Sequence, residues 1–242
     1  MPYKRPPITE AIIELQFARP SDQSTIEKAA RRIREEYTFE DPDSAVNLSF
    51  DASTNKTEVQ TAWMGTRLSS SDRADILIFR TTAFVCSRLA PYGGWEAFRP
   101  RAAHAWDVWK RAAGPTPLAR IGVRYINRID VPLAGNVLID VDHYLNLSTR
   151  SPEALGEPMT AYTMQIVRPL GADDCHLILT SGTVASPLIG FASFALDLDI
   201  FRATNLPMRD DELWALIDRI RGHKNRVFES CVTDRARALF DQ

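Results

Sequence analysis

The sequence is poor in cysteine, with three in 242 residues, and it contains no long apolar run. Cys86, Cys175 and Cys231 lie far apart in apolar segments, so we expect buried thiols rather than disulfides or a zinc site. No stretch approaches the roughly 18 consecutive apolar residues that cross a bilayer. Glu10 and Glu14 interrupt the first apolar run, which argues against a signal peptide. We therefore expect a cytoplasmic protein that does not contact a membrane.

An excess of one charge is also missing. The 29 lysine and arginine residues nearly balance the 31 aspartate and glutamate residues, and the net charge is -2 at pH 7. This balance excludes a protein that binds nucleic acid through an overall basic surface. The apolar content of 45% and charged content of 25% are those of an ordinary globular protein. A chain of this length buries roughly 70 to 75% of its unfolded surface, so its core needs no disulfide or metal for stability.

The signatures of common catalytic sites are absent too. There is no Gly-x-Ser-x-Gly elbow, Gly-rich phosphate loop, His-Glu-x-x-His or Cys-x-x-Cys. We therefore predict no cofactor and no catalytic residue. Asp140, Asp142 and His143 form the one tight group of carboxylates with a histidine, but a metal ion would need more ligands. Because Asp140 suits a helix N-cap, we interpret this group as the start of a short helix and predict no metal site.

The most informative segment is residues 118–131, which we predict to be one long central strand. Apolar and charged residues alternate along it, so a pleated strand would have an apolar face and a cationic face. The apolar positions are Ile121, Val123, Tyr125, Ile129 and Val131, and the charged positions are Arg120, Arg124, Arg128 and Asp130. Because the segment is about twice the usual strand length, we expect it to curve or bulge at Gly122.

Periodicity and turn residues predict the other elements. In the first part of the chain they indicate a strand at 7–17, a helix at 24–37 capped by Ser24 and Glu27, strands at 45–51, 57–68 and 74–90, and a helix at 95–113. In the second part they indicate a short helix at 140–147, strands at 159–168, 174–185 and 190–201, and a long helix capped by Asp210 or Asp211. A cap at Thr233 and Asp234 then starts a final helical turn that ends in Leu239 and Phe240. Trp95, Trp106 and Trp109 lie on one helical stripe, which is typical of a core.

These elements predict an α+β fold with two similar halves, 1–114 and 115–242, separated at Gly-Pro-Thr-Pro. Each half is expected to follow the order strand, helix, three strands, helix, with mostly antiparallel sheets packed against helices. We expect the halves to associate closely as one compact unit through their first strands. That arrangement would bring Glu10 and Glu14 near Arg124 and Arg128.

Several segments resemble the TIGR04255 family of bacterial proteins, which is sporadically distributed and has no assigned activity. The segments are Pro7-Ile8-Thr9-Glu10-Ala11, Leu89-Ala90-Pro91-Tyr92 with Trp95, Arg124-Tyr125-Ile126-Asn127-Arg128-Ile129, Leu196-Asp197-Leu198-Asp199, and Lys224-Asn225 with Phe228. The resemblance covers nearly the whole chain. It implies a bacterial, cytoplasmic protein of accessory distribution, such as those that accompany mobile or defence loci, and it transfers no site residue.

The candidate binding site is a polar sheet face. Its residues are Glu10, Glu14, Arg124, Arg128, Asp197 and Asp199. Asp197 and Asp199 are two apart on a predicted strand, so their carboxylates point the same way and need cations between them. One interpretation is a lattice of cross-strand ion pairs. A second is a polar cavity in which Arg124 and Arg128 bind an anionic ligand by bidentate hydrogen bonds, and a third is metal binding by the two aspartates.

The function predicted first is a non-enzymatic binding or regulatory module that recognises a protein partner or a small anionic ligand. One alternative is a metal-assisted hydrolytic enzyme that uses the sheet carboxylates. Another is a nucleic-acid-binding protein that uses Arg31, Arg32 and Arg34 or the basic run at 219–237. That run lacks interleaved aromatic residues and any known DNA-reading motif, so we place nucleic acid below a protein partner.

Overall fold

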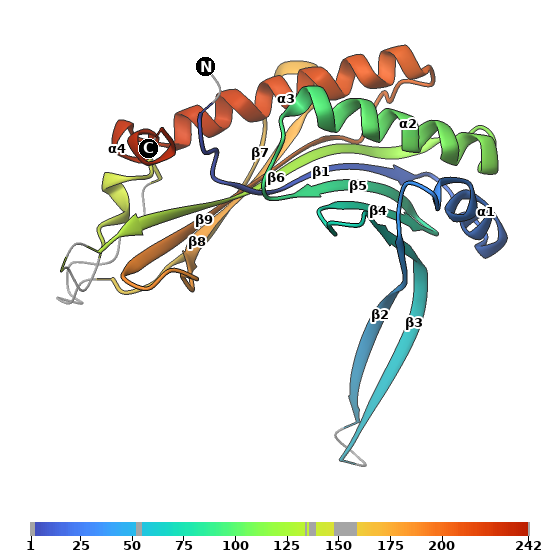
Figure 1. Ribbon diagram of the computed structural model, residues 1–242, viewed down its shortest axis with the longest axis horizontal. Coiled ribbons are helices and arrows are strands. Elements are labelled where there is room, and N and C mark those ends of the chain that lie inside the picture. The colour runs from blue at the N-terminus through green and yellow to red at the C-terminus, as the bar shows by residue number, and fades with distance from the viewer. Residues whose placement is uncertain (1–2, 52–54, 134, 136–138, 148–158, 242) are drawn as a thin grey trace. The chain divides into compact units, whose positions relative to one another are not determined.

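The computed structural model describes residues 3–51, 55–133, 135, 139–147 and 159–241, and its fold is α+β (Figure 1). The described strands are β1 (Ile8–Phe17), β2 (Phe39–Asp51), β3 (Lys56–Ser69), β4 (Asp75–Arg80), β5 (Ala83–Leu89), β6 (Leu118–Pro132), β7 (Thr163–Pro169), β8 (His176–Val184) and β9 (Phe191–Arg202). The described α-helices are α1 (Gln23–Ile33), α2 (Trp95–Ala113), α3 (Asp210–Cys231) and α4 (Asp234–Phe240). The predicted fold class is confirmed.

The strands form one open sheet in the order β2-β3-β4-β5-β1-β6-β9-β8-β7. The chain starts at the middle of this order with β1, continues at one edge with β2, and returns strand by strand to the side of β1. It repeats the path from β6 through the other edge, β7, and back to the side of β6. The two first strands are therefore neighbours, as expected.

Two predicted elements differ in kind from the observed ones, and others differ in their bounds, such as the strand expected at 45–51, which begins at Phe39. The strand expected at 74–90 is a pair, β4 and β5, that turns at Thr81 and Thr82. Because this turn contains no Gly, Pro, Asn or Asp and joins two apolar strands, the sequence shows no break there. The helix expected at 140–147 is one 3-10 turn, Val141–His143.

Contacts along the chain define two compact units. Unit 1 comprises residues 1–12, 89–92 and 121–242, and unit 2 comprises residues 13–88 and 93–120. Their boundaries fall within β1 and β6, whereas the predicted halves meet at residue 114. The division into two similar halves stays a prediction.

In unit 2 the core forms around α2. Trp109 stacks on Phe17 and Phe79, with ring centroids 4.8 and 5.4 Å apart, and Trp106 meets Phe84 edge-on at 5.5 Å. These tryptophans and Trp95 are buried, which confirms that the stripe is core. Such stacked and edge-on pairs are the favoured geometries of aromatic side chains.

Helix α1 has a different N-cap from the predicted one, and it ends at Ile33 rather than at residue 37. Its N-cap is Asp22, whose carboxylate accepts a hydrogen bond from the Thr25 backbone N–H at 2.8 Å. Ser24, the predicted cap, instead donates its hydroxyl to Asp22 at 2.6 Å. Asp22 satisfies the backbone donor better because its carboxylate carries a full negative charge at the positive end of the helix.

In unit 1 the strand β6 has the predicted alternation, and Ile121, Val123, Tyr125, Ile129 and Val131 are all buried. It pairs residue for residue with β9 from Ile121 opposite Arg202 to Pro132 opposite Phe191. The pairing of β6 with β9 therefore has no bulge at Gly122, where one was expected. The two strands are of similar length and stay in register throughout.

The helices of unit 1 supply the rest of its core. Leu216, Ile217 and Ile220 of α3 are buried, and Thr233 caps α4 as expected from the sequence. The N-cap of α3 is Arg209, so Asp210 and Asp211 occupy the first turn instead of the cap. Acidic side chains are favourable there because the helix dipole is positive at its N-terminus.

Cys86, Cys175 and Cys231 are free and buried, as predicted. No helix within the described ranges is long and apolar enough to cross a membrane.

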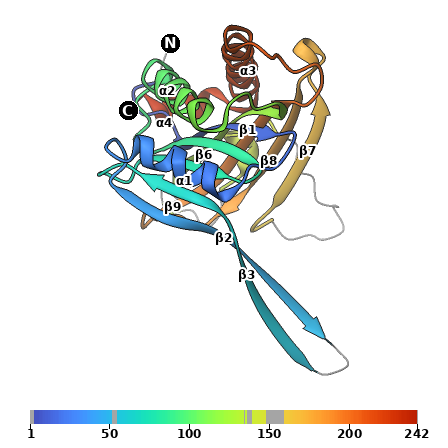
Figure 2. The ribbon, with the colours of Figure 1, turned by 90° about the vertical axis from the view of Figure 1, so that its right-hand side faces the viewer.

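In unit 2 the strands β2 and β3 continue past their neighbours as a two-stranded ribbon (Figure 2). β3 pairs with β4 only over Gly65–Ser69, so residues 44–51 and 56–63 form a ribbon without a third strand, which we call the arm. A register shift between Asp43 and Ser44 leaves Met64 as an extra residue at its base. Arg80 holds this base through an ion pair with Asp43 at 2.6 Å. Such bulges bend and twist a strand, which suits the point where the arm leaves the sheet.

Candidate functional site

The predicted polar face exists on β6 and β9, opposite the buried Tyr125. Nε of Arg124 donates to both carboxylate oxygens of Asp197, at 2.9 and 3.1 Å, and its Nη2 donates at 2.5 Å. The hydrogen bond to Asp197, followed by the charges of Asp197, Asp199 and Glu10, raises the pKa of the Arg124 guanidinium. The structure therefore brings these four predicted residues together.

The other two predicted residues have different partners. Arg128 donates from Nε to Asp130 at 3.0 Å, and Asp130 also accepts the Ser193 hydroxyl at 2.5 Å. Glu14 belongs to unit 2, where it pairs with Arg120 at 2.6 Å. Asp130 and Arg120 alternate with the apolar residues of β6, but sequence alone could not tell which acid would lie beside which arginine.

This face has the geometry of an ion-pair lattice. The Nε and Nη2 atoms of Arg124 and of Arg128 already donate to Asp197 and Asp130. An anion would compete with these carboxylates for the same donors. The arginine side chains are 46% and 37% exposed, so each ion pair stabilises the fold by at most about 1 kcal/mol. The anionic-ligand site therefore stays a prediction.

The described residues also contain no group of three His, Cys, Asp or Glu side chains placed to share a metal ion. Asp140 instead accepts a hydrogen bond from the Asp142 backbone N–H at 3.0 Å, at the start of the 3-10 turn. This is the capping role interpreted from the sequence.

Two arginines of the basic run at 219–237 form ion pairs with acids of unit 1. Arg219 donates to Asp173 at 3.0 Å, and Arg237 contacts Glu229 at 3.1 Å and Asp234 at 2.6 Å. Cations engaged in this way release little binding energy toward phosphates. These two arginines therefore give little support to the nucleic-acid alternative, which stays a prediction.

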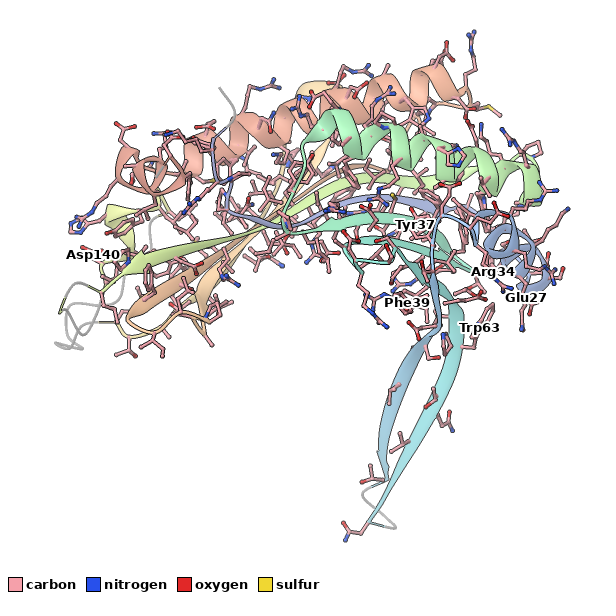
Figure 3. All side chains as sticks on the ribbon, viewed as in Figure 1. Glu27, Arg34, Tyr37, Phe39, Trp63 and Asp140 are labelled. Atoms are coloured by element: carbon pink, nitrogen blue, oxygen red, sulfur yellow. The ribbon has the colours of Figure 1, made fainter. Side chains whose placement is uncertain are left out.

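A groove of about 560 Å³ lies between α1 and the base of the arm. Its lining comprises Gln23, Glu27, Arg31, Arg34, Glu40, Asp41, Pro42, Trp63 and Thr66. Arg34 on α1 pairs with Glu40 on β2 at 2.7 Å, and Figure 3 labels Arg34 with Glu27 and Trp63. The sequence showed only the basic side of α1, because the strand residues that complete the groove are distant in the chain.

The arm exposes apolar side chains. Val46 is 61% and Val59 is 64% exposed. Val46 pairs with Thr61, Leu48 with Val59, and Phe50 with Thr57. Directly paired positions lie on the same face of a ribbon, so Val46 and Thr61 share one face with Val59, which is two residues from Thr61. Sequence reasoning found the two strands but not that they lack a third.

A third feature, which sequence reasoning missed, is buried Lys224 on α3. Only 7% of this residue is exposed, and Nζ lies 3.8 Å from the centroid of the Tyr125 ring. The Tyr125 hydroxyl is 2.9 Å from that of Tyr92. The sequence does contain a signal for this burial. Ile217, Ile220, Lys224 and Phe228 are three or four residues apart, so Lys224 lies on the apolar stripe of the helix.

A scan against models of known protein families gives no match to this chain, and neither does a search of curated proteins. The fold and these surfaces define the class as an α+β protein with an exposed two-stranded arm. Its family and function stay predictions.

Proposed function

We propose that this protein is a non-enzymatic binding module whose arm is inserted into an apolar cleft of a different protein. The observation that carries the proposal is the exposure of Val46 and Val59 on a ribbon without a third strand. An isolated two-stranded ribbon has marginal stability in water, and a partner that covers its apolar face would stabilise it.

The size of the arm favours an enclosing partner over a second copy. With residues 44–51 and 56–63, it is about 27 Å long and about 10 Å wide, so one face covers about 270 Å². Two arms packed face to face would bury about 500 Å² in total, whereas a specific interface needs at least about 1,000 Å². A cleft that contacts both faces and the edges of one arm reaches that area.

The groove at the base of the arm provides a polar rim for the same partner. Trp63 is half-buried there, and the charged residues of α1 and β2 surround it. An apolar centre with a polar, charged rim is the usual composition of a protein–protein interface. Tryptophan is also enriched among residues that dominate binding energy.

The test uses the double variant Val46→Asp/Val59→Asp and a matched control, Val167→Asp. Val167 on β7 is 62% exposed, so the control adds one aspartate at equal exposure outside the arm. Tagged full-length proteins are purified from the native cell, and the partner's affinity is then measured with purified components. We expect one stoichiometric partner with the wild type and the control, and at least about tenfold weaker binding with the double variant.

Two results would overturn the proposal. One is a partner that binds the double variant as tightly as the wild type. The other is a dimer of the purified wild type, detected by light scattering, that the double variant loses, because the arm would then bind a second copy. Equal urea-unfolding midpoints of all three proteins show that the substitutions leave the fold intact.

A further inference from the structure

We propose that Lys224 is a covalent binding site for small aldehydes, which condense with its amine to form an imine. This site is independent of the arm, because its residues lie in unit 1 and the arm lies in unit 2. It rests on the position of one buried amine and on the groups that surround it.

The amine has an unusual environment for a lysine. The residue is more than nine-tenths buried, and its Nζ contacts the face of the Tyr125 ring. Within the described ranges no carboxylate lies within ion-pair distance of Nζ, and no hydrogen bond engages it. Buried lysines normally have an ion-pair or hydrogen-bond partner. Because Lys224 has neither among the described residues, its amine is available to a ligand.

The surrounding groups favour the neutral amine. Burial is the largest cause and the charge of Arg221 the second, and together they lower the pKa of Lys224 to about 7. Glu229 on the same helix opposes this shift. The face of the Tyr125 ring of β6 also opposes the shift, because an aromatic face attracts a cation. The hydroxyl of Tyr125 lies 2.9 Å from that of Tyr92, which follows β5. A desolvated lysine beside another cation is the usual arrangement for an amine nucleophile.

The reagent must be small. Some side-chain nitrogen and oxygen atoms are fully enclosed and have no hydrogen-bond partner. Among the described residues that are not exposed, the nitrogen Nε1 of Trp106 is the one atom of this kind. Nζ of Lys224 also lacks such a partner, so it is not fully enclosed and keeps some contact with solvent. With 7% of the residue exposed, the solvent contact through which a reagent would reach the amine is narrow, which favours a short aliphatic aldehyde.

The condensation requires no co-reactant. The lone pair of Nζ forms a bond to the aldehyde carbon, and the carbonyl oxygen takes a proton to give a carbinolamine. The C–O bond then breaks, and the oxygen leaves as water with the two hydrogens that the nitrogen gives up. The product is a neutral C=N bond between Lys224 and the former aldehyde carbon, and one water molecule balances the step.

The experiment measures which lysine reacts. Full-length protein is incubated with propanal and sodium cyanoborohydride at neutral pH, which converts each imine to a stable propyl adduct. Peptide mass spectrometry then gives the rate at every lysine. Lys28, exposed on α1, is the internal control. The neutral fraction at pH 7 is about a thousandfold larger for an amine with a pKa near 7 than for an ordinary lysine, so we expect Lys224 to react at least about tenfold faster despite its burial.

The controls separate a reactive site from accidental labelling. In denaturant the preference for Lys224 should disappear, and the Arg221→Gln variant should react more slowly at neutral pH because its amine is protonated more often. Raising the pH above 7 should accelerate Lys224 by at most about twofold, because a pKa of about 7 already leaves half of its amine neutral. A rate at Lys224 no greater than that at Lys28 in the folded protein would overturn the proposal, as would an unchanged preference in denaturant.

Discussion

Replacing Lys224 with methionine should change how stability depends on pH. Methionine keeps a long, unbranched side chain under Tyr125 but removes the titratable amine. In the folded protein the pKa of Lys224 is lowered from 10.5 to about 7. Below pH 7 the amine is charged in both folded and unfolded chains, so the wild type bears the full cost of burying a cation. We therefore expect the variant to gain most, relative to the wild type, in acid.

The sign and size of the effect follow from proton linkage. Between pH 7 and 10.5 the unfolded wild type binds a proton that the folded wild type lacks, so its free energy of unfolding rises with pH. The slope is about 1.4 kcal/mol per pH unit once the folded amine is neutral. From pH 7 to 9 the wild type should thus gain about 2 to 3 kcal/mol relative to the methionine variant.

Urea unfolding of both proteins at several pH values between 7 and 9 measures this difference. All other titrating groups are common to the two chains, so their contributions cancel when the curves are subtracted. The Lys28→Met variant is the matched control, and its difference from the wild type should not vary with pH, because Lys28 is exposed. If the Lys224→Met difference is constant to within about 0.5 kcal/mol, Lys224 is not desolvated and the reasoning is refuted.

Two further predictions concern hydrogen bonds in unit 1. Thr233→Ala should destabilise the protein by about 1 kcal/mol in urea unfolding, because the Thr233 hydroxyl caps α4 and donates to the His143 carbonyl at 2.7 Å. The control Thr233→Ser keeps the hydroxyl and should retain most of that stability. Equal losses in the two variants would contradict the capping role. Arg124→Ala should cost no more than about 1 kcal/mol, since its ion pair with Asp197 is half exposed. If the sheet face binds a small anion, calorimetric titration with phosphate or citrate should lose its signal in this variant, and an unchanged signal would contradict binding there.

The sequence predicted most of the elements because their patterns are local. The alternation along β6, the aromatic stripe of α2 and the Thr233 cap each depend on residues a few positions apart, and the structure confirms all three. The turn between β4 and β5 was missed for the same reason: Thr81 and Thr82 are not turn residues by type. The backbone of that turn bonds to residues distant in sequence: the Thr81 N–H donates to the Met64 carbonyl, and the Thr82 carbonyl accepts from the Phe17 N–H.

The candidate site was predicted less completely, because ion pairing depends on register. Alternation places Arg124 and Arg128 on one face, but either arginine could pair with any acid on a neighbouring strand. The observed register sets Arg124 opposite Asp199 and beside Asp197, and it leaves Arg128 to Asp130 on its own strand. Burial of Lys224 has the same origin, since a helix pattern shows which residues share a stripe but not what covers them.

The free energy gained on binding at each surface depends on whether its side chains already have partners in the free protein. A ligand at Arg124 would replace an existing bidentate ion pair with another, so the net gain is small. Covering Val46 and Val59, each more than half exposed, would remove apolar area from water without breaking any bond, which is favourable by about 1 kcal/mol for each side chain. The same reasoning applies to Lys224, whose amine has no competing hydrogen bond within the described residues. By this reasoning an added molecule would gain more free energy at the arm or at the buried amine than at the polar face of β6 and β9.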